Sequence, residues 1–152
     1  MALTRSELTS PIASILLIDD NSMGLEARKA VLEELGHRIT AAATPTEAKV
    51  IAVAHKFDLV ITDYRMPEMT GTELIQWMRG QGMACPIILI SGFVDTLGLT
   101  EENTGADMVI QKSSHEVSHM VRAVKSLLRP KKPAGSQAPA KTLRSKKANT
   151  QG

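Results

Sequence analysis

The sequence predicts an α/β fold in which five strands alternate with helices along the chain. Two observations support this prediction. Five short runs of aliphatic or small residues recur along the chain, and such runs are typical of parallel strands covered on both faces. Most of the segments between them carry apolar residues at helical spacing, and three segments begin with the pattern of a capping box. Alternation of this kind favours a parallel sheet with helical crossovers.

The predicted strands are short and are bounded by polar residues, Gly or Pro. The run FDLVIT is representative, because its Leu-Val-Ile centre suits a strand that is buried on both faces. In chain order, the strands are predicted at residues 15–18, 38–43, 57–62, 86–90 and 108–111.

The predicted helices are recognised by their first residues. Asn21 or Ser22 caps the first helix, and Gly36 ends it. The second helix begins with TPTE at residues 44–47, a capping box with Pro at the first helical position. The third begins with TGTE at residues 70–73, a second capping box.

The second half of the chain contains a weaker helical segment. Gly98 and several Thr residues lower the helix propensity there, so we expect only a short helix near residues 95–103. The last helix is predicted to begin with SSHE at residues 113–116, a third capping box, and to run to Leu128.

Five strand–helix units of this kind predict a doubly wound sheet with the strand order 2-1-3-4-5, in which the first and third strands are neighbours. The carboxyl ends of parallel strands meet at one edge of a sheet. We therefore expect the polar residues that follow four of the strands to converge there: Asp19 and Asp20, Asp63, Ser91 and Lys112.

Each of these residues also has a simpler interpretation when it is taken alone. Asp63 would be a turn former or helix cap, and Asp19 and Asp20 would be a capping pair. Ser91 would be a turn residue, and Lys112 a surface lysine with its stem along the protein. Their expected convergence at one edge favours a shared site.

Three carboxylates at one edge repel one another, so without a cation at least one of them would have a raised pKa. A hard divalent cation relieves this repulsion. Mg²⁺ prefers oxygen ligands and takes one or two carboxylates together with phosphate oxygens. The acids therefore predict a Mg²⁺ site.

Residues 12–128 resemble the receiver domain of two-component response regulators, which has a flavodoxin-like fold. The loop DYRMPEMTGTEL at residues 63–74 is close to the family signature. The residues that match the family's site, in the family's order, are Asp19, Asp20, Asp63, Ser91 and Lys112.

The resemblance implies a role for each of these residues. Asp63 would be the phosphoacceptor, with Ser91 and Lys112 on the oxygens of the phosphoryl group. Mg²⁺, for which Mn²⁺ can substitute, would be bound by Asp20, Asp63 and the backbone carbonyl of Arg65, with Asp19 acting through a water.

Two positions depart from the family's pattern. Ser113 follows Lys112 where the family often has Pro after a cis peptide bond, and Val109 stands where an aromatic switch residue is common. These changes keep the acceptor chemistry but argue against an aromatic flip as the switch. Arg65 and Phe93 would line the approach to the acceptor.

The chain is expected to have three parts: a flexible lead-in at residues 1–11, the receiver domain at 12–128, and a disordered basic tail at 129–152. The first 128 residues carry 11 basic and all 16 acidic residues, a net charge of −5. The tail carries the remaining basic residues. It would bind nucleic acid or another polyanion weakly, and its simplest interpretation is a solvated tail.

The resemblance implies a stand-alone response regulator that accepts a phosphoryl group from a histidine kinase or phosphotransfer protein. It would signal by contact with an unidentified downstream protein, or pass the group on in a phosphorelay. The alternative is a receiver-type regulator that associates with nucleic acid through its basic tail.

Two further classes are less consistent with the sequence. A phosphohydrolase of the haloacid dehalogenase type usually needs a second Asp two residues after its nucleophile, where this chain has Arg65. A receiver that binds partners without phosphorylation would not need all five site residues. We therefore expect no enzymatic activity beyond Mg²⁺-dependent self-phosphorylation and autodephosphorylation.

The expected location is the cytoplasm, without membrane insertion. The single cysteine excludes an internal disulfide and fits a reducing cytosol. The sequence lacks an apolar run of the roughly 20 residues that a membrane-spanning helix needs, and its first residues do not form a signal-peptide pattern.

Overall fold

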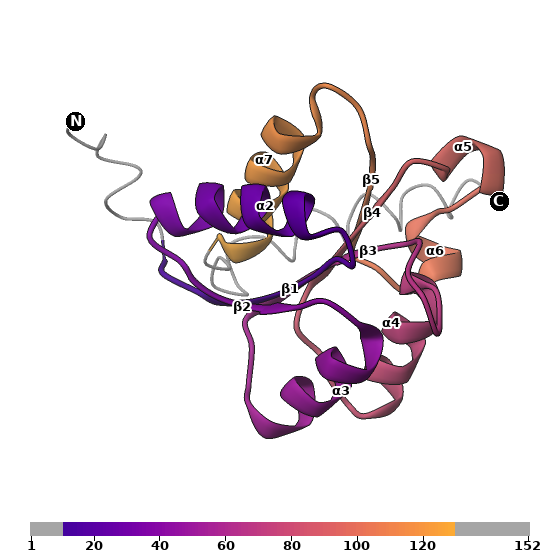
Figure 1. Cartoon of the computed structure of the whole chain (residues 1–152), viewed down its shortest axis with the longest axis horizontal. Coiled ribbons are helices and arrows are strands. Elements are labelled where there is room, and N and C mark those ends of the chain that lie inside the picture. Colours follow the sequence, from indigo (N-terminus) through magenta and orange to yellow (C-terminus); the bar gives the residue numbers. More distant parts are fainter. Residues whose placement is uncertain (1–10, 130–152) are drawn as a thin grey trace, which may run out of the picture.

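Five parallel strands form one sheet in the order β2-β1-β3-β4-β5, and helices cover both of its faces (Figure 1). The arrangement comes from a computed structural model, which describes residues 11–129. The predicted fold class and strand order are therefore confirmed. The strands are β1 (Ser14–Ile18), β2 (Arg38–Ala42), β3 (Leu59–Asp63), β4 (Ile87–Ser91) and β5 (Met108–Gln111).

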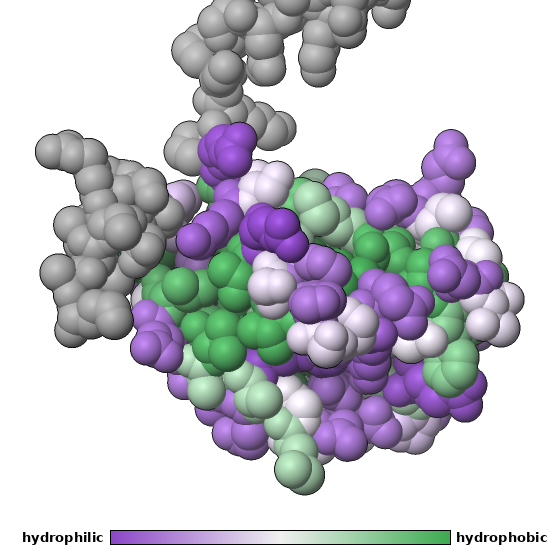
Figure 2. All heavy atoms as spheres, turned by 90° about the horizontal axis from the view of Figure 1, so that it is seen from above, coloured by the Kyte–Doolittle hydropathy of each residue, from purple (hydrophilic) through white to green (hydrophobic). Residues whose placement is uncertain are grey.

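The helices lie in two layers, with α2 and α7 on one face of the sheet and α3 and α4 on the other (Figure 1). Figure 2 looks onto the molecule from the side of α2 and α7, where hydrophilic and hydrophobic residues are mixed. The described helices are α2 (Ser22–Glu34), α3 (Pro45–Ala54), α4 (Gly71–Gly80), α5 (Val94–Leu97), α6 (Glu101–Thr104) and α7 (Glu116–Leu128).

Side chains of the central strands alternate between the two layers. In β1, Ile15 and Leu17 belong to the core beneath α2 and α7, whereas Leu16 and Ile18 belong to the core beneath α3 and α4. All four are fully buried. Burying a side chain of this size stabilises the fold by about 1.5–3 kcal/mol, so the sheet is held from both sides.

The register of the strands brings their carboxyl ends to one edge. Ile18 of β1 is paired with Thr62 of β3. The next residues in the two strands, Asp19 and Asp63, therefore lie side by side at the carboxyl ends. On the other side of β3, Asp63 is paired with Ile90 of β4. Asp63 is the last residue of its strand, which places its side chain at the edge of the sheet.

Two of the three predicted capping boxes cap their helices through Thr. At the start of α4, Thr70 and Glu73 make both reciprocal hydrogen bonds of the box. At the start of α3, Thr44 accepts a hydrogen bond from the backbone N–H of Glu47, but the Glu47 carboxylate accepts from the backbone N–H of Ala43. The predicted helix starts are therefore correct, although the second half of the α3 box differs.

The third predicted capping box, at residues 113–116, is wrong. Helix α7 begins only at Glu116 and has no side-chain hydrogen bond at its cap. The Ser113 hydroxyl accepts a hydrogen bond from the backbone N–H of His115. The Glu116 carboxylate instead accepts two hydrogen bonds from Arg28 of α2. Charge-assisted bonds of this kind are stronger than a neutral cap, which explains the difference.

The weak helical segment forms two single turns rather than the one helix expected at residues 95–103. Gly98 adopts the left-handed conformation, with φ 64°, and ends α5. Thr100 and Asn103 then form their own capping pair at the start of α6. The Gly therefore divides the segment, because it supplies a backbone conformation that stops a helix.

The loop between β3 and α4 is pressed against the end of β3. The backbone N–H of Gly71 donates to the carbonyl of Tyr64 over 2.7 Å, and a Cβ atom at Gly71 would collide with the carbonyl oxygen of Asp63. Only glycine permits this close approach. The loop thus holds the segment that follows Asp63 beside the sheet edge.

The predicted lead-in and basic tail lie outside the described residues, apart from residues 11 and 129 at their limits. Within residues 11–129, the longest helices have 13 residues, and none is long and apolar enough to cross a membrane.

Candidate functional site

The three predicted acids meet at the carboxyl edge of the sheet. One carboxylate oxygen from each of Asp19, Asp20 and Asp63 lies within 4.8 Å of the others. Asp19 and Asp63 are buried, with exposed fractions of 1% and 2%, and Asp20 is exposed. The site therefore combines two carboxylates inside the protein with one that faces solvent.

The start of α2 fits closely around Asp19. One Asp19 oxygen accepts a hydrogen bond from the backbone N–H of Asn21, and the Asn21 side chain caps the helix by accepting from the N–H of Gly24. A Cβ atom at Gly24 would lie 2.8 Å from the other Asp19 oxygen. The absence of a side chain at Gly24 thus leaves room for the Asp19 carboxylate beneath the helix.

The predicted cation and hydroxyl lie at the same edge. The Lys112 ammonium group donates to Oδ2 of Asp63 over 2.9 Å. Ser91 is 1% exposed, and its Oγ accepts a hydrogen bond from the backbone N–H of Phe93. Ser91 is paired with Gln111 in the register of β4 and β5, which brings Lys112 to the end of the sheet beside it. The structure therefore brings all five predicted residues to one edge.

A second cation in the site, Arg28 of α2, was not predicted. Its Nη1 donates to Oδ2 of Asp19 over 2.8 Å and to Oδ1 of Asp63 over 3.2 Å. Its Nε and Nη2 donate to Oε2 of Glu116 over 3.0 and 2.6 Å. The guanidinium group therefore joins the acids of the sheet edge to the first residue of α7.

A sequence signal for Arg28 did exist. It lies three residues after Leu25 and four before Leu32, and these two leucines form part of the buried stripe of α2. A charged residue in such a stripe is almost never fully buried unless it is paired. The position of Arg28 therefore indicates a buried partner, but it does not identify Glu116, which is 88 residues away.

Comparison with protein families identifies the family of the chain. The model of the response regulator receiver domain matches residues 15–125, which include all of these site residues. The chain belongs to the response regulator receiver family. The family predicted from the site motifs is thus confirmed.

Curated relatives of this receiver domain include both larger regulators and a kinase. The virulence transcriptional regulatory protein PhoP of Salmonella typhimurium is 25% identical over 118 residues, which are 76% of this chain and 51% of PhoP. A probable histidine kinase 1 of Oryza sativa is 34% identical over 67 residues, which are 44% of this chain and 7% of that protein. The chain thus spans about half of PhoP and a small part of the kinase.

Solved receiver structures have the same fold. The response regulator TrrA from Thermotoga maritima, in complex with Mg(2+)-BeF, has 29% sequence identity and a TM-score of 0.68, covering 77% of this chain and 100% of TrrA. A CheY-like receiver domain protein from Methanospirillum hungatei has 27% identity and a TM-score of 0.70, covering 78% of this chain and 94% of that one.

The environment of Asp19 in this receiver disfavours its charge. Burial, together with a smaller contribution from the nearby charge of Asp63, raises the pKa of its carboxyl group to about 6. The hydrogen bond from Asn21 and the positive charge of Arg28 act in the opposite direction, but they do not offset the burial. The carboxyl group of Asp19 thus holds its proton up to a higher pH than an exposed aspartate does.

Arg28 itself remains charged. Burial acts to lower its pKa, but the hydrogen bond to Glu116 and the charges of Asp63, Glu116 and Asp19 outweigh this effect and raise the pKa above its ordinary value. A guanidinium group cannot be deprotonated in a protein in any case. The receiver therefore carries a permanent cation between its acids and α7.

Two exposed side chains stack between the loops that follow β3 and β4. The Arg65 guanidinium carbon lies 4.5 Å from the centre of the Phe93 ring, a cation–π contact. Arg65 follows Asp63 by two residues and Phe93 follows Ser91 by two, so the contact joins the loops after β3 and β4. The two residues predicted to line the approach to Asp63 thus contact each other.

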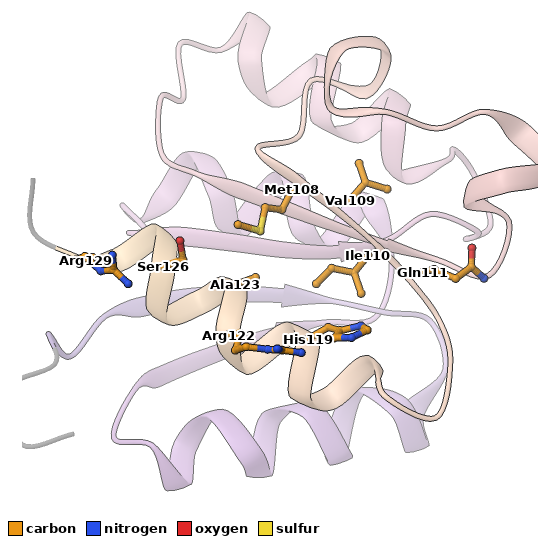
Figure 3. A pocket seen from close by; sticks show the side chains of 9 residues that line it. All are labelled: Met108, Val109, Ile110, Gln111, His119, Arg122, Ala123, Ser126 and Arg129. Carbon is orange, nitrogen blue, oxygen red and sulfur yellow. The ribbon is translucent and has the colours of Figure 1, made fainter. Parts of the chain in front are cut away.

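A surface pocket of the receiver lies elsewhere, between β5 and α7 (Figure 3). It includes Val109, the residue at the switch position, but none of the acids. Its lining residues are Met108, Val109, Ile110, Gln111, His119, Arg122, Ala123, Ser126 and Arg129.

Proposed function

We propose that this receiver domain accepts a phosphoryl group on Asp63 in a Mg²⁺-dependent reaction, with the phosphohistidine of a histidine kinase or phosphotransfer protein as donor. The observation that carries the proposal is the surroundings of Asp63. Its carboxylate is buried, Lys112 contacts one of its oxygens, and it shares the sheet edge with Asp19 and Asp20.

The acid cluster fits a small divalent cation. Three carboxylate oxygens lie within 4.8 Å of one another, and hard oxygen ligands are those that Mg²⁺ prefers. A cation bound at the same place would also offset the burial and the charge of Asp63 that raise the pKa of Asp19. We propose that Asp20, Asp63 and the backbone carbonyl of Arg65 bind Mg²⁺ directly, that Asp19 acts through a water, and that Mn²⁺ can substitute.

Bound Mg²⁺ would supply two positive charges to the phosphoryl oxygens. The chain's own residues would do the rest. An oxygen of Asp63 attacks the phosphorus atom, a P–O bond forms as the P–N bond of the donor breaks, and the imidazole leaves with the electron pair of that bond and takes up a proton. The product is an acyl phosphate on Asp63.

Ser91 and Lys112 would hold the transferred group. Lys112 already contacts Asp63 and offers three N–H donors to new phosphoryl oxygens. The Ser91 hydroxyl, at the end of β4, offers a further hydrogen bond. Positioning and charge neutralisation of this kind are most of what phosphoryl transfer requires from a protein.

The output would be a change in protein contacts or a phosphorelay step. A receiver domain is a signalling domain, and the family includes transcriptional regulators such as PhoP. We propose that autodephosphorylation returns this receiver to its starting state and that the partner is a downstream protein.

Intact-mass spectrometry tests the acceptor. In the presence of Mg²⁺ and acetyl phosphate, the parent protein should gain the mass of one phosphoryl group, stable in acid and labile in base. Asp63→Asn should gain none, because its amide is not a nucleophile at phosphorus. As a control, Asp58→Asn changes an Asp at the opposite end of β3, which accepts from the backbone N–H of Ser14, and should leave labelling intact. Equal labelling of Asp63→Asn would exclude Asp63 as the acceptor.

A further inference from the structure

Arg28 divides its hydrogen bonds between two groups of carboxylates. Nη1 contacts Asp19 and Asp63 at the edge of the sheet, and Nε and Nη2 contact Glu116 at the start of α7. The Arg28 side chain is 5% exposed. The fork of the guanidinium group allows one cation to serve both groups, which an ammonium group could not do with the same geometry.

The charges around Arg28 are not balanced. Four carboxylates, of Asp19, Asp20, Asp63 and Glu116, lie together with two cations, Arg28 and Lys112. The cluster therefore has a formal charge of about −2 with all carboxylates ionised. Without Arg28, this charge would be one unit more negative around two buried carboxylates, those of Asp19 and Asp63.

Both oxygens of Asp63 are in use. Lys112 contacts Oδ2 and Arg28 contacts Oδ1, and the same Nη1 of Arg28 also contacts Asp19. A divalent cation that binds through Asp63 therefore meets a positive charge already at its ligands. Two cations that share the same carboxylate in a buried site repel each other strongly.

We propose that Arg28 is an internal counter-cation that competes with Mg²⁺ for Asp19 and Asp63, and that Glu116 retains it when the metal ion enters. The proposal rests on the function proposed above, since it concerns the same metal site. Arg28 is thus a positioning residue that stabilises the metal-free receiver and lowers its affinity for the ion.

Glu116 determines how easily Arg28 releases Asp63. Two of the three Arg28 nitrogen atoms already donate to Glu116, so Nη1 can leave Asp63 while the guanidinium group keeps a charged partner. Without the Glu116 carboxylate, Arg28 would have only the sheet-edge acids as partners. Metal binding would then leave a buried charge unpaired, which is costly. Removal of Arg28 and removal of the Glu116 charge should therefore change the affinity in opposite directions.

Calorimetric titration of the full chain with Mg²⁺, without phosphodonor, tests the proposal. Arg28→Met should bind Mg²⁺ at least about tenfold more tightly, because a charge that opposes the ion is removed from a buried site. Glu116→Gln should bind it at least about threefold more weakly for the reason given above. Arg122→Met removes the same type of charge from an exposed position on α7 and should bind within about twofold of the parent.

A second variant and a second measurement allow for loss of folding. Arg28→Lys keeps a cation in the core but cannot bridge both groups, so its Mg²⁺ affinity should lie between those of the parent and Arg28→Met. In thermal unfolding, both variants should have a lower Tm than the parent without metal. Their Tm should also rise more than that of the parent when Mg²⁺ is added, because tighter binding stabilises the folded state more.

The outcomes separate this proposal from the proposed function. If the parent binds Mg²⁺ and both Arg28 variants bind it equally well or more weakly, Arg28 does not compete with the ion, although the metal site stands. A Glu116→Gln variant that binds more tightly than the parent would overturn the role of Glu116. If neither the parent nor any variant binds Mg²⁺, the metal site itself is wrong.

Discussion

Asp19 and Asp20 are neighbours in sequence but differ in their environment. Asp19 is buried, and its two oxygens accept hydrogen bonds from Asn21 and Arg28. Asp20 is exposed. An exposed carboxylate can bind an ion with little rearrangement, whereas Asp19 must first give up a partner. The proposed division of labour, with Asp20 as a direct ligand and Asp19 acting through a water, agrees with this difference.

We therefore expect different effects from replacing each acid. Asp20→Ala should abolish Mg²⁺ binding and phosphorylation with acetyl phosphate. Asp19→Ala should weaken both less, by about 10- to 100-fold in affinity, the usual effect of removing an outer partner of a metal site. Calorimetric titration and intact-mass spectrometry measure the two effects. Parent-like binding by both variants would mean that the metal site is misassigned.

At the scale of elements, a buried histidine joins two strands. His37 precedes β2, and its Nδ1 accepts a hydrogen bond from the backbone N–H of Ala13, which precedes β1. Burial lowers the pKa of His37 below 6.5. The folded protein therefore binds fewer protons at this position than the unfolded chain does as the pH falls below 6.5. Stability that is fully present above pH 6.5 is lost as the pH falls through the folded pKa.

Between pH 7.5 and pH 5.5, His37 and Asp19 change the stability in opposite directions. The lowered pKa of His37 makes the free energy of unfolding fall as the pH falls, whereas the raised pKa of Asp19 makes it rise. Relative to the parent, His37→Asn should therefore lose less stability or gain more over this range, because its Oδ1 can still accept the hydrogen bond but does not titrate. Urea unfolding at the two pH values measures the difference. The exposed His55→Asn serves as the control, and its stability should change with pH as that of the parent does. An unchanged pH dependence in His37→Asn would contradict the assignment.

The segment between β4 and β5 is held by a few polar contacts. Helices α5 and α6 have four residues each. No residue of α5 is buried, and Gly98 is exposed. The Gln111 side chain accepts from the backbone N–H of Val94, and the Glu101 carboxylate accepts from that of Val109. Leu99 and Ala106 pack against the core beneath α3 and α4, but no residue from 92 to 98 is buried, and stretches of this kind open easily. The segment also follows Ser91 directly, so a movement of Ser91 would be transmitted to it.

We expect activation to order this segment instead of flipping a switch side chain. Val109 has few rotamers and no polar group to exchange between buried and exposed positions. Hydrogen exchange with and without Mg²⁺ and beryllofluoride should show the largest gain in protection over residues 92–105, with little change in β5. Slow exchange in this segment without ligand, or exchange that the ligand leaves unchanged, would rule this mechanism out.

At the scale of the whole molecule, one sheet supports two cores. Ile88 and Leu89 are adjacent in β4 and are both fully buried, but they face opposite layers. Neither layer can remain packed without the sheet, so the described domain should unfold in one step.

Shortening a side chain in either core tests whether the two layers unfold together. Ile88→Ala and Leu89→Ala should each lower the free energy of unfolding by about 2–5 kcal/mol. Circular dichroism and the fluorescence of Trp77, which lies in α4 and is the chain's single tryptophan, should report coincident transitions in both variants. Val53→Ala, at a site that is 66% exposed, should change the stability by less than about 0.5 kcal/mol. Separate transitions would show that the layers unfold independently.

Much of this architecture follows from local patterns. The aliphatic runs predict the strands, because a strand buried on both faces needs apolar residues throughout. The strand order then brings Asp19, Asp20, Asp63, Ser91 and Lys112 to one edge, since parallel strands end on the same side. The starts of α3 and α4 follow from Thr, whose side chain accepts a backbone hydrogen bond within the same turn.

Local patterns gave wrong predictions at positions where a side chain can form hydrogen bonds either with nearby residues or with distant ones. Glu116 has the spacing of a capping residue, but its carboxylate lies against Arg28 of another helix. The Gly98 segment reads as one weak helix, whereas Thr100 and Asn103 restart it as a separate turn. In both cases the outcome depended on which competing hydrogen bonds were available in the folded chain.

By itself, the sequence determined the fold class and the five residues of the predicted site, because strand burial and strand ends are properties of short segments. The predicted strand order rested on the doubly wound arrangement that such units adopt. Only the tertiary structure decided that Arg28 lies among the acids and that Glu116 holds its other side. These two residues are 88 positions apart and meet because α2 and α7 cover the same face of the sheet. A long charged side chain buried between two helices takes its partners from that packing, which no local pattern of residues can specify.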